Sequence, residues 1–313
     1  MQLPYFVPFY TAHPALLSAG LACGETEAAK NWYLNDTVRI YGRVLEENGK
    51  LSIDSFLGGG DCWSIPFLRH SMLAICSIPR VAPKLLKNAL GQGFYCNLHF
   101  EKLDFSSLCR ALDPQTKDAT IYGFDETENG FFLSGAAATG PHRFFLPSSL
   151  LLEEAQSCTE KRDGTIEFLR PQPKEQPLLP EKIRKDLAEY IGGVPYAEAP
   201  PESCIAAFSG VDTADFLSFF PLAADRFAAK RALRLQTEHR ACMTKRLFSL
   251  ERQRVIKEGL APEYLGCAEM FSRLSGAVLQ GERISSSDIT IYKDEERAVL
   301  RKVLDSMGGQ HEN

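Results

Sequence analysis

The spacing of apolar and polar positions divides the chain into a first half of mixed strands and helices and a second half of helices. In the first half, helical spacing covers residues 14–30 and 81–92. Short runs rich in β-branched and aromatic residues predict strands at 36–46, 93–100, 119–125, 130–134, 142–146 and 164–170. The pair Asn129-Gly130 between two of these runs predicts a hairpin turn.

Residues 171–180 (PQPKEQPLLP) hold four prolines, and we interpret them as a linker. The segments after it have helical spacing, and they cover 180–191, 211–220, 223–257, 261–280 and 287–307. Strands followed by helices predict an α+β fold. We therefore expect an N-terminal domain at 1–172, with helices packed on a small antiparallel sheet, and a mainly helical domain at 173–313.

Composition and charge exclude several classes of protein. The formal net charge is −5, which gives no overall attraction to nucleic acid. The opening MQLPYFVPFY lacks the basic and apolar regions of a signal peptide, and no apolar run is long enough to span a membrane. We therefore expect a cytoplasmic protein that binds neither nucleic acid nor membrane.

The nine cysteines are scattered, with no CxxC pair and no histidine at ligand spacing. This pattern argues against a structural zinc site and against a disulfide framework. No P-loop, GxGxxG or HExxH sequence is present. We therefore expect no metal and no cofactor.

Cys62 is the strongest candidate nucleophile. It follows Gly58-Gly59-Gly60 in the segment GGGDCWSIPFLRH, where the thiol could lie at a helix N-terminus. Such a position lowers a thiol pKa, and the glycines could leave backbone N–H groups for an oxyanion. The alternative is a buried cysteine at a loop–helix junction beside a packed Trp63.

A cysteine nucleophile needs a base, and only six histidines are available. His99 and His142 lie in predicted strands at positions that could face a cleft. The alternative is a structural role for either histidine. A Cys–His pair is a relation in space, so the sequence does not choose between them.

The predicted helix 223–257 is strongly basic. Between residues 226 and 257 there are ten basic and two acidic residues, a local charge of +8, so the rest of the chain carries −13. We expect the cations of this helix to dock an acidic protein or a phosphate group, and the candidates are Arg226, Lys230, Arg231, Arg234, Arg240 and Lys245. The alternative is a solvated face that pairs with acidic surface elsewhere in the fold.

Several short motifs occur in an order that resembles a known family. They are PFYTAHPALLS at 8–18, NWYLND at 31–36, DCW at 61–63, GFYCNL at 93–98 and KDATIYGFD at 117–125. Together they resemble the papain-like acyltransferase family of butirosin biosynthesis, found in bacterial natural-product clusters and distantly similar to bacteriocin-processing cysteine peptidases. The resemblance covers about residues 1–170 and implies a papain-like domain.

The chain departs from this family at the catalytic positions. The family's cysteine, histidine and aspartate fall on Pro14, Lys117 and Ser134, so none of the three roles carries over. The resemblance implies a function in nonribosomal-peptide or related biosynthesis, on an acyl or peptidyl thioester held by a carrier protein. One hypothesis is acyl transfer or thioester hydrolysis with Cys62 as nucleophile. The other is an inactive papain-like scaffold that binds protein partners.

Overall fold

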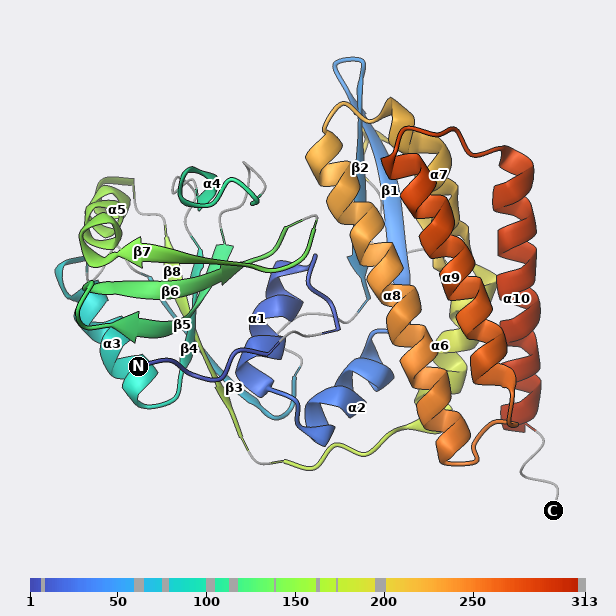
Figure 1. Cartoon of the computed structure of the whole chain (residues 1–313), viewed down its shortest axis with the longest axis horizontal. Coiled ribbons are helices and arrows are strands. Elements are labelled where there is room, and N and C mark those ends of the chain that lie inside the picture. The colour runs from blue at the N-terminus through green and yellow to red at the C-terminus, as the bar shows by residue number, and fades with distance from the viewer. Residues whose placement is uncertain are drawn as a thin grey trace. The chain divides into compact units, whose positions relative to one another are not determined.

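The structure is a computed structural model of the whole chain (Figure 1). It describes residues 1–6, 9–58, 65–74, 79–99, 105–112, 118–137, 139–161, 164–172, 174–194 and 201–308. Cys62 and Lys117 lie outside these residues. The fold class is α+β, with helices and two antiparallel sheets.

The chain forms two compact units. Unit 1 comprises residues 1–29 and 61–176, and unit 2 comprises 30–60 and 177–313. Residues 30–60 were predicted to lie in the N-terminal domain, but they form part of unit 2 with the C-terminal helices. The proline-rich linker at 171–180 contains the third crossing between the units, at residues 176 and 177.

Unit 1 is built on a six-stranded antiparallel sheet with the order β3-β8-β4-β5-β6-β7. The strands are β3 (Leu68–Ala74), β4 (Tyr95–His99), β5 (Asp118–Asp125), β6 (Gly130–Gly135), β7 (His142–Pro147) and β8 (Thr165–Pro171). The predicted hairpin between β5 and β6 is confirmed, and Asn129 adopts a φ of +47° in its turn. The last strand, β8, inserts between β3 and β4, and this insertion creates the site described below.

The helices of unit 1 pack on this sheet. They are α1 (Pro14–Cys23), α3 (Ala82–Gly91), α4 (Phe105–Leu108) and α5 (Ser148–Lys161), with a 3₁₀ turn at Pro79–Val81. The prediction of one helix over 14–30 was wrong, because the chain turns at Gly24 and a second helix, α2 (Glu27–Asp36), begins after it. Gly24 has a φ of +69°, and a Cβ there would lie 2.9 Å from the Phe6 ring.

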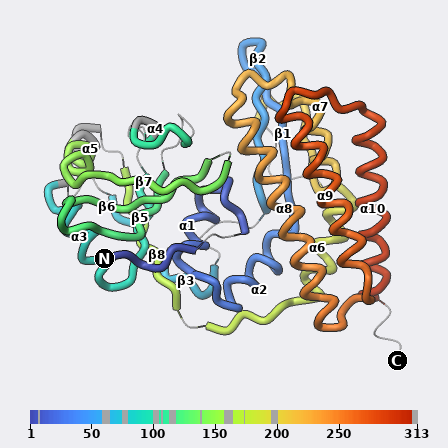
Figure 2. The backbone as a smooth tube through the Cα atoms, in the orientation of Figure 1, coloured from blue at the N-terminus to red at the C-terminus, as the bar shows by residue number. Residues whose placement is uncertain are grey.

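Unit 2 combines a three-stranded sheet with long helices. The strands β1 (Ile40–Glu47), β2 (Lys50–Leu57) and β9 (Cys204–Ser209) have the order β2-β1-β9. The helices are α6 (Pro180–Gly192), α7 (Phe216–Phe219), α8 (Arg226–Arg252), α9 (Leu260–Leu279) and α10 (Ser286–Gly308), with 3₁₀ turns at Gly210–Asp215 and Phe220–Leu222. Helix α8 packs on β2 and on α9, and α9 packs on α10 (Figure 2).

Buried polar contacts explain why residues 30–60 belong to unit 2. Arg246 of α8 is fully buried and donates to the carbonyls of Tyr33 and Leu34 at the end of α2. The Tyr33 carbonyl also accepts hydrogen bonds from the backbone N–H and the hydroxyl of Thr37, and the helix dipole stabilises a cation at this end of α2. On β2, Ser55 accepts a hydrogen bond from Gln236 of α8 at 3.1 Å.

Within the part of the chain that the structure describes, every helix is too short or too polar to cross a membrane.

Candidate functional site

A row of ionisable side chains crosses four adjacent strands of unit 1. Side chains directly opposite each other in an antiparallel pair lie on the same face of the sheet. Asn97 pairs with Glu167 on one side and with Thr120 on the other, and His99 pairs with Asp118. His70 on β3 lies two residues from Met72, the partner of Glu167, and so shares this face. The insertion of β8 thus aligns residues from four separate parts of the sequence.

Glu167 is the centre of this row, and its side chain is only 3% exposed. Its Oε1 contacts Nε2 of His70, and its Oε2 lies 3.2 Å from Nε2 of His99. Asn97 donates to the same Oε2 at 3.0 Å. An ionised carboxylate only accepts hydrogen bonds, so both imidazole nitrogens that face Glu167 carry protons.

His99 is held by a second carboxylate on its other side. Its Nδ1 lies 2.5 Å from Oδ1 of Asp118. Burial lowers the pKa of His99, but hydrogen bonds and charges from Asp118 and Glu167 outweigh burial and raise it from 6.5 to about 9. His99 is therefore an imidazolium at neutral pH. Its side chain is 36% exposed and that of Asp118 is 35% exposed, so the cluster opens to solvent at this end.

Helix α1 lies along the same face and continues the polar row. Thr120 donates to Oδ1 of Asn97, Ser18 of α1 lies 2.6 Å from the Thr120 hydroxyl, and Ser18 donates back to the carbonyl of Pro14. Burial and then the charge of Cys23, at the C-terminal end of α1, raise the pKa of Tyr95, so this end of α1 lies near the first residue of β4 and away from His99 at its last. The N-terminus of α1, where the helix dipole is positive, therefore lies towards the end of the sheet that carries His99 and Asp118.

The two histidines predicted as candidate bases, His99 and His142, lie on opposite faces of the sheet. His99 belongs to the cluster. His142 pairs with Gly135, the neighbour of Ser134, so it lies on the opposite face from Thr120 and His99, and its Nε2 is 2.9 Å from the Thr139 hydroxyl. The two histidines therefore cannot act on one substrate from the same face. Cys62, the predicted nucleophile, lies outside the described residues.

The positions that match the lost catalytic triad have other contacts here. Pro14 is the first residue of α1, with His13 as its N-cap. Ser134 is fully buried on β6, and its hydroxyl lies 3.0 Å from that of Tyr5. The guanidinium of Arg143, opposite Ser134 on β7, stacks over the Tyr5 ring at 3.7 Å. Lys117 lies outside the described residues.

Glu167, His70 and Asp118 were not predicted as site residues from the sequence. A glutamate inside the short apolar run TIEFLR was the available signal, because a charged residue within a buried strand needs a partner. The order of the strands was required to identify that partner. Without it, nothing in the sequence connects residues 70, 99, 118 and 167.

Three of the described thiols are poor candidates for the nucleophile. Burial raises the pKa of Cys23 to about 12, and burial together with Glu296, Glu295 and Glu263 raises that of Cys267 to about 12. Burial also raises the pKa of Cys96 well above its usual range. Neutral thiols of this kind are poor nucleophiles. Within the described residues, no cluster of three His, Cys, Asp or Glu side chains is arranged to hold a metal ion.

In unit 2, the predicted docking cations of α8 do not all reach the surface. Arg226, Lys230, Arg234 and Lys245 are exposed and Arg231 is half-buried. Arg240 is 1% exposed, so the prediction that it belongs to a docking surface was wrong.

The physical reason is a buried carboxylate on α10. Arg240 lies 3.4 Å from Oε2 of Glu296, which also accepts hydrogen bonds from the hydroxyls of Tyr190, Tyr264 and Tyr292. The guanidinium stacks over Phe271 at 3.8 Å. These contacts compensate the buried charges inside unit 2 and leave none for a ligand.

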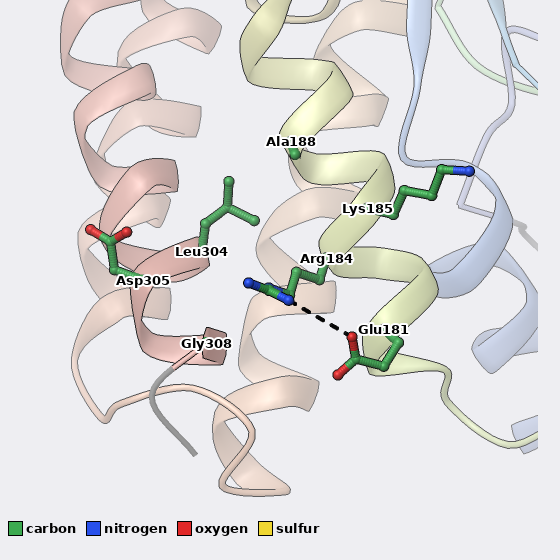
Figure 3. Close-up of a pocket in the computed structure, with 7 residues that line it drawn as sticks. All are labelled: Glu181, Arg184, Lys185, Ala188, Leu304, Asp305 and Gly308. Atoms are coloured by element: carbon green, nitrogen blue, oxygen red, sulfur yellow. Dashed lines mark ion pairs between the residues drawn. The ribbon is translucent and has the colours of Figure 1, made fainter. Parts of the chain in front are cut away.

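Unit 2 also has a surface groove between α6 and α10, with a volume of about 550 Å³. Figure 3 shows its lining residues, which are Glu181, Arg184, Lys185, Ala188, Leu304, Asp305 and Gly308. Arg184 and Glu181 are 4.0 Å apart, and the charges of the groove have both signs. The groove offers no convergent set of groups for chemistry, so the cluster around Glu167 is the stronger candidate site.

No protein-family model matches this chain, and no curated protein matches it.

Proposed function

We propose that unit 1 carries an acid–base site for acyl transfer or thioester hydrolysis, centred on His99. The observation that carries this proposal is the geometry of His99, which is solvent-accessible while Asp118 lies 2.5 Å from its Nδ1. A carboxylate in this position fixes the ring and stabilises its imidazolium form, as in acid–histidine–nucleophile triads. Strongly shifted pKa values cluster at functional sites, which supports the same assignment.

The proposed reaction takes an acyl or peptidyl thioester on a carrier protein as its substrate, in bacterial natural-product biosynthesis. Cys62, identified from the sequence, is the proposed nucleophile and forms a new carbon–sulfur bond while the thioester bond of the substrate breaks. The His99 imidazolium gives its proton to the departing thiolate. Water or an amine then attacks the acyl-enzyme and gives a proton to His99. The carbon–sulfur bond to Cys62 breaks, and Cys62 is released as the thiolate that began the cycle, which balances it.

The arrangement of α1 on the sheet supports a papain-like origin for unit 1. In the proposed site, the N-terminus of α1 lies towards the strand ends that carry the acid–histidine pair. The departure from the family lies in the residues: the histidine comes from β4 instead of position 117, and its acid comes from Asp118 of β5 instead of position 134. We propose that the acid–base pair has moved by one strand.

A second candidate is a catalytically inactive scaffold that binds protein partners. The contacts of His99 favour it, because carboxylates hold both ring nitrogens and leave neither directed at a substrate. In this case the cluster would be a buried ion-pair network that stabilises the sheet.

The rate of acyl transfer or hydrolysis from a panel of acyl thioesters tests the two candidates. The acid–base proposal predicts that His99→Gln and Cys62→Ala each lower the rate by about 100-fold or more. His142→Gln is the matched control, since His142 lies on the opposite face of the same sheet, and it should keep the wild-type rate. A wild-type protein with no turnover would favour the scaffold. Equal activity of wild type and His99→Gln would remove His99 from the chemistry.

A further inference from the structure

The exposed positions of α8 form one cationic stripe. The positions are Arg226, Lys230, Arg234, Lys245, Phe248 and Arg252, together with Ala241. At 3.6 residues per turn, all of them fall within about 100° of the helix circumference. We call this row the α8 stripe, and it runs for about 39 Å along the helix. Five of its seven positions are lysine or arginine, and none is acidic.

The positive charge of the α8 stripe is only partly compensated within the protein. Arg234 pairs with the buried Glu238 at 2.8 Å. Arg226 donates to the carbonyls of Phe220 and Pro221, which are neutral. Among the described residues, no carboxylate lies within 4.0 Å of the cationic groups of Lys230 or Arg252. The stripe therefore presents net positive charge on a protein whose overall charge is −5.

An apolar side chain lies inside this charged row. Phe248 is 43% exposed, and it occupies the stripe between Lys245 and Arg252. A single exposed aromatic residue is common on protein surfaces. Aromatic residues and arginine are nevertheless enriched in protein–protein interfaces, whose rims are polar.

We infer that the α8 stripe docks an acidic helix of a partner protein. The stripe is one helix face wide, and acidic side chains spaced alternately three and four positions apart would stay on one face of a partner helix and match it. A nucleic-acid duplex or a membrane surface is wider than the stripe and would also meet the rest of unit 2, which outside residues 226–257 holds 13 basic and 22 acidic residues, a charge of −9. Charge complementarity therefore selects an acidic protein helix.

This inference names the partner surface for the proposed function, in which an acidic partner delivers the acyl group. The role of the partner as acyl donor rests on the proposed function, whereas the docking itself does not. Binding is measured without turnover, so failure of the docking surface and failure of the acid–base site would be separate results.

Fluorescence anisotropy with a labelled helical peptide as long as α8, carrying glutamates spaced alternately three and four positions apart on one face, tests the inference. We expect Lys230→Glu with Arg252→Glu to weaken binding by about tenfold. The matched control is Arg273→Glu with Arg301→Glu, which changes net charge equally on exposed positions of α9 and α10 and should change binding less than about twofold.

Phe248→Ser supplies a second test that does not depend on charge. We expect it to weaken peptide binding by about threefold without changing the salt dependence. Equal weakening by the two double variants would overturn the inference, because it would show a general charge effect. Absence of peptide binding at low salt, or tighter binding of a DNA duplex or phosphatidylserine vesicles, would also overturn it.

Discussion

The carboxylate of Asp118 lies 2.5 Å from Nδ1 of His99, at directly paired positions of β5 and β4. On the other side of the ring, Oε2 of the buried Glu167 lies 3.2 Å from Nε2. Two carboxylates therefore hold one imidazolium at the solvent-exposed end of the polar row.

The first prediction concerns the pH dependence of stability through His99. Its pKa is raised from 6.5 in the unfolded chain to about 9 in the folded protein. Its stabilisation is therefore complete below pH 6.5 and is lost as the pH rises through about 9. Because the ring is partly exposed, we expect a loss of only about 1 kcal/mol. Urea unfolding from pH 6 to 10 should show this loss of unfolding free energy in wild type. The same pH dependence of the unfolding free energy in His99→Gln would contradict the prediction.

The second prediction concerns His70, which acts on His99 through Glu167. Removing its N–H in His70→Phe takes a donor from a buried carboxylate and disfavours the charge of Glu167. The pKa of His99 should then fall from about 9 by roughly one unit. NMR titration of the His99 ring measures this shift. His70→Gln retains an amide donor and should show a smaller fall, whereas equal pKa values in wild type and His70→Phe would show that His70 is only a packing residue.

The strands of unit 1 illustrate how far the sequence predicts this fold. The alternation of apolar and polar residues, together with turn residues, predicted β4, β5, β6, β7 and β8. The predicted hairpin turn at Asn129 is confirmed. Residues 50–57 and 204–209 were missed as strands because polar and small residues interrupt their apolar pattern. The single helix over 14–30 was wrong because one glycine with a positive φ was not recognised as a turn.

The site was harder to predict from the sequence than the fold. His99 could be identified as a candidate because it lies in a strand pattern, but its partners depend on strand order. β8 is the last strand of unit 1 in sequence and lies between β3 and β4 in space, which brings Glu167 between His70 and His99. Similarly, Arg240 was indistinguishable from surface cations until its contact with Glu296, 56 positions along the chain, was known.

The third prediction concerns the pair Arg240 and Glu296 in the core of unit 2. Glu296→Leu leaves a buried guanidinium and three tyrosine hydroxyls without their acceptor, and we expect a loss of about 3–5 kcal/mol. Arg240→Met leaves the carboxylate without its cation and should cost a similar amount. The double variant should lose less than the sum of the two, by about 1 kcal/mol or more. Urea unfolding followed by circular dichroism measures this cycle, and additive losses would contradict the pairing.

The fourth prediction concerns His239, whose behaviour opposes that of His99. Burial and the charges of Arg246 and Arg240 lower the pKa of His239 well below 6.5, and its Nε2 donates to the carbonyl of Val38 at 2.8 Å. The unfolded chain takes up a proton below pH 6.5 that the folded protein does not, so unit 2 loses stability as the pH falls below 6.5. Hydrogen exchange of α8 amides, corrected for intrinsic rates, should increase there. His239→Phe should remove this pH dependence, and its persistence in that variant would assign it to another group.

The most direct test of an acid–base site in unit 1 is the intact mass of the protein after incubation with acyl thioesters, comparing wild type, Cys62→Ala and His99→Gln. The proposal predicts an acyl adduct on wild type, none on Cys62→Ala, and much slower formation on His99→Gln, with His142→Gln equal to wild type. An adduct that forms equally on wild type and His99→Gln would contradict the central role of His99. Absence of any adduct, with Cys62 also unreactive to alkylation in the folded protein, would contradict the catalytic proposal and leave the scaffold.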